Sequence, residues 1–117
     1  MWKLKRRFDR YLYDILESIS RIKEYTHNVE LEELKKNQLR IDATARNLEI
    51  IGEAVSQLHE KIKKKYPEVP WQDIKDFRNV VIHKYHTLDL EIIWDIIEHK
   101  LDPLKKQIQM ILKKENK

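Results

Sequence analysis

Four polar side chains interrupt the apolar pattern of one predicted helix: Arg78, Asn79, His83 and Tyr85. Arginine presents a fixed fork of N–H donors that fits the oxygens of a phosphate group, and it keeps its charge. Histidine takes up or releases a proton near neutral pH. An asparagine next to them can orient the histidine or hold a phosphate. These residue types therefore favour chemistry at a phosphate group.

One such reaction, the cleavage of RNA by its own 2′-hydroxyl group, needs no metal ion. A base removes the hydroxyl proton, a cation stabilises the phosphorane, and a 2′,3′-cyclic phosphate results. His83 and His86 are three residues apart and offer only two metal ligands, without cysteine or clustered carboxylates, so we predict no metal site. An arginine and a histidine on a helix are also ordinary solvated residues, and spacing alone leaves that reading open.

The positions of these residues around the helix point to a shared site. At about 100° per residue, Phe77 and Val81 lie within about 40° of each other and mark the side that faces the core. Asn79 and His83 lie near 200° and 240° from Phe77, on the opposite side, and Arg78 lies near 100°, at the edge. Because Arg78 and His83 are about 140° apart, we expect a site to which two chains contribute.

Composition predicts one all-helical domain. A length of 117 residues suits a single domain over 1–117. The chain has one glycine and three prolines, too few for the frequent turns of a sheet protein. Charged residues alternate in sign and 41% of the chain is hydrophobic, which is typical of solvated helix faces rather than of disorder. The expected fold class is all-α, an antiparallel bundle of four to six helices.

Apolar residues spaced by three and four predict two long helices, over about 5–26 and about 37–65. The polar stretch between them leaves room for a short helical turn. Gly52 lies inside the second helix, where glycine costs roughly 1 kcal/mol relative to alanine, and it predicts the close approach of another helix. Glu53 is expected to bond Arg46 or a neighbouring helix, in packing rather than in catalysis.

Three more helices are predicted after "YPEVPW", because proline disfavours helical geometry in the residue before it. The third begins near residue 72 and ends at 85 or 86. The fourth, over 87–99, is apolar nearly all round, which predicts burial on several sides. Asp102 and Pro103 predict the start of the last helix, as its cap and its first helical position.

The charge and the cysteine content limit the binding partners and the cellular location that we expect for the protein. A formal net charge of +4 and a pI near 9.2 permit nucleic acid as a partner. The lack of cysteine excludes disulfides and thiolate zinc sites and fits an intracellular location. The start of the chain lacks the apolar run of a signal peptide, and no run approaches the ~18 residues of a membrane span. We therefore expect a cytoplasmic protein that does not enter the membrane.

The sequence "RNVVIHKY" matches an Arg-x4-His-x-Tyr motif, and the polar Asn79 directly follows its arginine. In this it resembles the HepT-type toxins, a branch of the HEPN superfamily of helical ribonucleases. The resemblance extends to "RNLEIIGEAVSQL" (46–58), "VPWQDIKDFRNVVIHKY" (69–85) and "LEIIWDII" (90–97), and so covers nearly the whole chain. The motif alone is weakly specific, whereas its combination with these segments is fairly specific.

The resemblance implies an HEPN-like homodimer whose two motifs meet in one cleft and cleave RNA without a metal or other cofactor. It implies Arg78 and His83 as catalytic residues, Asn79 as a supporting residue and Tyr85 as an acceptor of AMP. The implied partner is an MntA-type minimal nucleotidyltransferase, the antitoxin of a type II or type VII-like toxin–antitoxin system. This antitoxin would silence the endoribonuclease toxin by transferring AMP from ATP to the tyrosine.

A different class of function uses the same cleft without catalysis. The protein would then be a helical module that binds nucleotide or RNA and serves as the partner of a nucleotidyltransferase. RNA that stays intact during a long incubation would distinguish this module from the enzyme. The presence of both Arg78 and His83 favours the enzyme.

Overall fold

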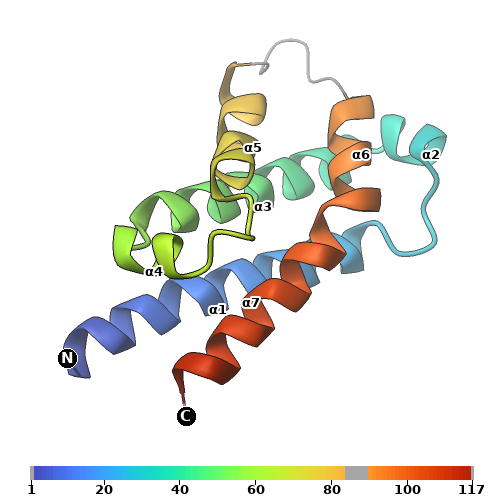
Figure 1. Cartoon of the computed structure of the whole chain (residues 1–117). Coiled ribbons are helices and arrows are strands. Elements are labelled where there is room, and N and C mark those ends of the chain that lie inside the picture. The colour runs from blue at the N-terminus through green and yellow to red at the C-terminus, as the bar shows by residue number, and fades with distance from the viewer. Residues whose placement is uncertain (1, 84–89, 117) are drawn as a thin grey trace.

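The structure, a computed structural model, describes residues 2–83 and 90–116, with side chains from 9 to 79 and from 90 to 116. Within these residues the chain forms helices and no strand, which confirms the predicted all-α class (Figure 1). The helices are α1 (Trp2–Tyr25), α2 (Leu31–Lys35), α3 (Gln38–Gln57), α4 (Glu60–Lys65), α5 (Trp71–His83), α6 (Leu90–His99) and α7 (Leu101–Glu115).

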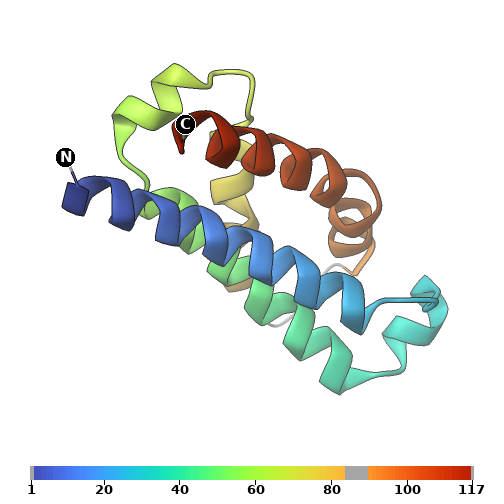
Figure 2. The same ribbon diagram turned by 90° about the horizontal axis from the view of Figure 1, so that it is seen from below.

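Two long helices, α1 and α3, run side by side in opposite directions, and they make one of the two largest helix contacts of the fold (Figure 2). The other joins α3 to α5, which crosses α3 at a steep angle (Figure 1). Helix α7 lies along α1, so the core is enclosed between α1, α3, α5 and α7. Helix α5 is thereby held on α3, and its position depends on that contact.

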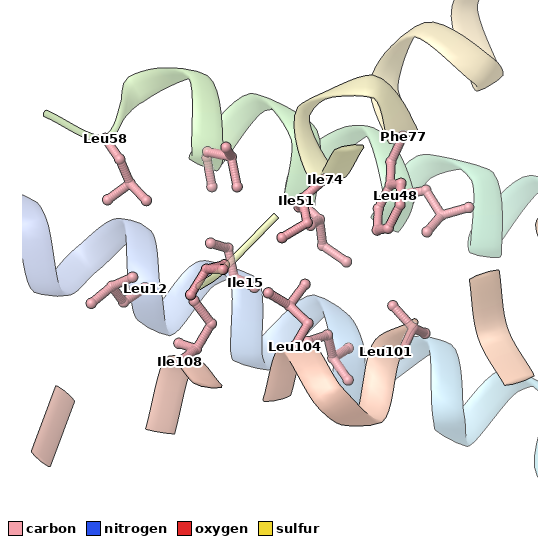
Figure 3. Close-up of a cluster of buried hydrophobic side chains, with 14 of the residues drawn as sticks. Leu12, Ile15, Leu48, Ile51, Leu58, Ile74, Phe77, Leu101, Leu104 and Ile108 are labelled. Atoms are coloured by element: carbon pink, nitrogen blue, oxygen red, sulfur yellow. The ribbon is translucent and has the colours of Figure 1, made fainter. Parts of the chain in front are cut away.

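The core is a single cluster of apolar side chains (Figure 3). These four helices contribute most of it, and α4, α6 and the chain on either side of α4 add the rest. The predicted stripes on α1 and α3 are confirmed where the structure describes them, with these residues buried: Leu12, Ile15, Ile19, Ile22, Leu48, Ile51 and Val55. Helix α5 adds Ile74 and Phe77, which are 2% and 4% exposed. These two side chains fix which face of α5 turns toward the core.

The predicted helix over 37–65 is wrong in one respect, because the chain breaks between α3 and α4. Leu58 has extended backbone angles (φ −67°, ψ 139°), and the ring of His59 accepts a hydrogen bond from the backbone N–H of Lys61 and caps α4. Leu58 and Ile62 stay buried on either side of the break. The spacing of apolar residues therefore continues although the chain changes direction, so the break cannot be recognised from that spacing.

The start of α7 also differs from the prediction. Its N-terminal cap is Lys100, and Leu101 is its first helical residue, so Asp102 and Pro103 stand second and third. The carboxylate of Asp102 forms an ion pair with Lys23 of α1. Proline is tolerated in this first turn, because the first backbone N–H groups of a helix have no partner inside it.

The polar connection contains the short helical turn that was predicted, as α2. Asn37 then caps α3, because its side-chain oxygen accepts a hydrogen bond from the backbone N–H of Arg40 at 3.1 Å.

Helix α6 is not buried on several sides, contrary to the prediction. Ile93 and Ile96 are buried, Leu90 and Trp94 are half-buried, and Ile92 is 39% exposed. Its larger contacts are with α7 and α2. Leu90 and Ile97 pack against the core, whereas Ile92 and Trp94 lie outside the core cluster.

Two aromatic side chains hold α4 and the loop after it. The indole N–H of Trp71 donates to the carbonyl oxygens of Lys63 and Tyr66, at 3.2 and 3.0 Å. The hydroxyl of Tyr66 donates to the carboxylate of Glu115 at the end of α7. Burial, together with this bond to Glu115, raises the pKa of Tyr66 to about 12. The entry into α5 is thus anchored at both ends of the loop.

Candidate functional site

Arg78 lies on α5 at the edge of the core, as its place in the helical pattern predicts. The preceding residue, Phe77, is buried, whereas the side chain of Arg78 is 43% exposed. The guanidinium group is therefore held on a buried framework and still reaches solvent. This combination suits an arginine that receives a phosphate group.

Gly52 of α3 permits the closest approach between α3 and α5. A Cβ atom added to Gly52 would lie 2.7 Å from the Cβ of Arg78, 2.9 Å from its backbone nitrogen and 3.0 Å from the carbonyl oxygen of Lys75. Since two of these three atoms belong to the backbone, no side-chain rotation could make room for it. The predicted close approach at Gly52 is confirmed, and the residue above it is Arg78.

Glu53, the next residue of α3, forms an ion pair with Arg78. Its Oε2 atom lies 3.1 Å from the Nη1 atom of Arg78, and its side chain is 52% exposed. Of the two partners predicted for Glu53, the structure selects the neighbouring helix. Arg46 instead pairs with Glu49 within α3, at 3.4 Å.

Arg78 lies at a cleft of about 340 Å³ between α1, α3 and α5. The cleft is lined by Tyr11, Asp14, Arg46, Glu49, Ile50, Glu53, Ala54, Gln57 and Arg78. Three carboxylates, two guanidinium groups, an amide and a phenol thus face a space large enough for a small ligand. The cleft offers both donors and acceptors of hydrogen bonds.

Asn79 points away from the core, as predicted, and it is exposed. Its side-chain amide donates to the carboxylate of Asp76 in the same helix, at 3.2 Å. His83 is the last described residue of α5, but its side chain lies outside the described part, and Tyr85 lies outside it altogether. The structure therefore gives the positions of the Arg78 and Asn79 side chains, while the roles of all four residues stay predictions.

The sequence predicted a neighbouring helix as one possible partner of Glu53, in a packing role, but it did not identify Arg78 as the partner. One signal was available, because Glu53 follows the single glycine of a long helix, the position where another helix was expected. No feature of the sequence indicated that Tyr11, Asp14 and Gln57 would line the cleft. Their side chains line the same cleft as Arg78 only because α1 and α5 pack against α3.

Among the described residues, no group of three or more His, Cys, Asp or Glu side chains could hold a metal ion. No described helix is both long and apolar enough to cross a membrane.

Fold and site together define a small all-helical domain that presents an arginine at the edge of a polar cleft. The chain belongs to the ribonuclease HepT-like family of the HEPN superfamily, whose model matches residues 15–111. No solved structure gives a significant match to the chain.

Several curated relatives match almost the full chain. It is 36% identical over 107 residues to "Putative RNase MJ1380" of Methanocaldococcus jannaschii, covering 92% of this chain and 98% of the relative. It is 41% identical over 103 residues to "Putative RNase MJ0127" of the same organism, covering 88% and 85%. It is 32% identical over 110 residues to "Probable ribonuclease HepT" of Thermococcus cleftensis, covering 94% and 100%.

Proposed function

We propose that the protein is an endoribonuclease that cleaves RNA without a metal ion, with Arg78 binding the phosphate and His83 moving the proton. The observation that carries the proposal is the half-exposed guanidinium of Arg78 at the edge of the cleft. Membership of the ribonuclease HepT-like family supports it, as do relatives that are named ribonucleases.

The reaction follows from the chemistry of RNA. His83 takes the proton of the 2′-hydroxyl group, and the 2′-oxygen attacks the adjacent phosphorus. The bond from phosphorus to the 5′-oxygen breaks, and that oxygen takes a proton from water and leaves as a 5′-hydroxyl group, while His83 returns its proton to solvent. The other product ends in a 2′,3′-cyclic phosphate. Arg78 stabilises the negative charge that grows on the phosphorane, and Asn79 supports the bound phosphate.

The active form in this proposal is a homodimer with a shared site. Arg78 and His83 are five residues apart on α5, so they lie about 140° apart around the helix axis. One helix brings two such side chains to the same phosphate only with difficulty. Two copies of α5 related by a two-fold axis could supply an arginine from one chain and a histidine from the other.

The finer proposal is that the ribonuclease is a cytoplasmic toxin of a toxin–antitoxin pair, silenced by AMP on Tyr85. The antitoxin would be an MntA-type nucleotidyltransferase. Tyr85 follows Arg78 by seven residues, nearly two helical turns, so a continued helix would return it to the same side. An AMP group there would add negative charge and bulk beside the phosphate site.

Cleavage of RNA in EDTA tests the proposal. We expect the purified protein to cut single-stranded RNA into products with cyclic phosphate ends, and the Arg78→Ala and His83→Ala variants to lose at least about 10²-fold in rate. Circular dichroism should show unchanged helicity. Cleavage that persists in both variants would contradict the assignment, and intact RNA with the wild-type protein would favour the non-catalytic module.

The same assay tests the regulation. Prior incubation with the cognate nucleotidyltransferase, ATP and magnesium should stop cleavage and add the mass of AMP to the protein. Tyr85→Phe should prevent both effects. A mass increase that survives in this variant would identify a different acceptor.

A further inference from the structure

We infer that Glu53 is a positioning residue: its carboxylate holds the guanidinium group of Arg78 in the orientation that receives the RNA phosphate. The inference rests on the proposed ribonuclease function and adds a residue from α3 to a site otherwise built on α5. It concerns how Arg78 is prepared for the phosphate.

The backbone of Arg78 is already fixed by the contact at Gly52, since its Cβ and nitrogen atoms lie directly over that glycine. What remains free is the side chain beyond Cβ, which has several rotatable bonds and many rotamers. A group that binds phosphate in a transition state is more effective when its orientation is settled beforehand. The contact at Gly52 therefore fixes the position of the Arg78 backbone, and the neighbouring Glu53 orients its guanidinium group.

The ion pair leaves most of the guanidinium group available. The described contact joins one nitrogen, Nη1, to Oε2 of Glu53 at 3.1 Å. Guanidinium has five N–H donors, so a contact through one end of the fork leaves the others for phosphate oxygens. A carboxylate that held both arms of the fork would compete with the phosphate instead.

Stability is a weak reason for this ion pair. Both side chains are about half exposed, at 43% and 52%, and exposed ion pairs contribute little to folding. The negative charge of Glu53 also repels an RNA phosphate, so its place beside Arg78 carries an electrostatic cost. A carboxylate in this position is better explained by orientation than by folding or by affinity for RNA.

The test is the cleavage rate of Glu53 variants of the full chain. We expect Glu53→Ala to lower kcat roughly tenfold with a smaller change in KM, because RNA still binds but Arg78 is less well aimed. Glu53→Gln should recover most of the rate, because its amide oxygen accepts the same hydrogen bond without the charge. In an Arg78→Lys background, which lacks the fork, Glu53→Ala should change the rate less than about twofold.

Glu17→Ala is the matched control. Glu17 pairs with Arg21 at 2.7 Å on α1, its side chain is 62% exposed, and it does not line the cleft. Its removal takes away the same charge and one exposed ion pair, and the rate should not change.

Three results would overturn the inference. Equal rates for Glu53→Ala and wild type would show that Arg78 needs no such support. Faster RNA cleavage by Glu53→Ala than by the wild type would show that Glu53 inhibits Arg78 rather than orienting it. A tenfold loss that Glu53→Gln does not recover, or that persists in the Arg78→Lys background, would assign the effect to charge or folding. A wild-type protein that cuts no RNA would instead refute the proposed function itself.

Discussion

Tyr66 joins two helices that are far apart in the sequence. Its side chain is 4% exposed at the end of α4, and its hydroxyl donates to the carboxylate of Glu115 on α7. Lys65 pairs with the same carboxylate at 2.8 Å. Burial is the main reason that the pKa of Tyr66 is raised to about 12, with the hydrogen bond to Glu115 next, because both disfavour the phenolate.

The raised pKa of Tyr66 predicts a loss of stability at high pH. A group whose pKa is higher in the folded state contributes its full stability below its unfolded pKa, near 10, and loses it as the pH rises to the folded value, about 12. The free energy of unfolding should therefore fall more between pH 9 and 11 in the wild type than in Tyr66→Phe, measured by urea denaturation.

Tyr13→Phe is the control for this experiment. Tyr13 is 55% exposed, so this substitution removes a phenol group that lies in solvent rather than in the core. All the lysines are common to the three proteins, so their contribution to the pH dependence cancels in the comparison. If Tyr13→Phe and Tyr66→Phe depend on pH alike, the buried phenol is not responsible.

At the scale of helices, the contact between α3 and α5 decides where the site lies. Ile74 and Phe77 anchor α5 in the core, and Gly52 lets the backbone of α5 come down onto α3. Glu53 and Arg78 meet as a result. The site is therefore a product of helix packing, and a change in the distance between the two helices should affect both stability and activity.

Gly52→Ala tests this contact. The new Cβ would lie 2.7 to 3.0 Å from atoms of α5, two of them in the backbone, so the helices must separate. Overpacking costs about 1–3 kcal/mol, while alanine favours the helix by roughly 1 kcal/mol. We expect the free energy of unfolding to fall by up to about 2 kcal/mol, and RNA cleavage to fall as Arg78 moves away from Glu53.

Ser56→Ala provides the comparison, because it raises helix propensity one turn later in α3 and adds no atoms. It also removes a hydroxyl that donates to the carbonyl oxygen of Glu53 at 2.7 Å, so stability should stay about equal. A Gly52→Ala protein that is more stable than wild type and cuts RNA normally would show that α3 and α5 separate easily, and that the close approach has no role in the site.

At the scale of the whole molecule, the monomer leaves apolar surface outside its core. Helix α6 keeps Ile92 39% exposed and Trp94 half-buried. The outer face of α5, which carries Asn79, also lies outside the core. A domain of this size would gain stability from a partner subunit, and the proposed shared site requires a second copy of the chain.

A dimer predicts a solution mass of twice 14.4 kDa by light scattering. It also predicts complementation, because a chain with only the arginine and a chain with only the histidine together form one intact site. Co-expression of Arg78→Ala and His83→Ala chains with different tags should restore about a quarter of the wild-type rate, as half the dimers are mixed and each has one intact site. A monomer that cleaves RNA would contradict the shared site.

Local patterns in the sequence were enough for the all-helical class, the buried stripes of α1 and α3, and the close approach at Gly52. Each depends on spacing within one helix, and an apolar stripe that must be buried specifies its own face. The HepT-like membership was also readable, since the motif at Arg78 stands in the sequence with its flanking segments.

The tertiary structure alone decided the break at Leu58 and His59, the exposure of α6, and the pairing of Glu53 with Arg78. The break leaves the apolar spacing intact, so no local pattern records it. Glu53 and Arg78 are 25 residues apart in sequence, and they meet only because α5 packs across α3 over a residue with no side chain. The periodicity of apolar residues determines which face of each helix is buried. Which helices pack against each other is determined by the packing of the whole core.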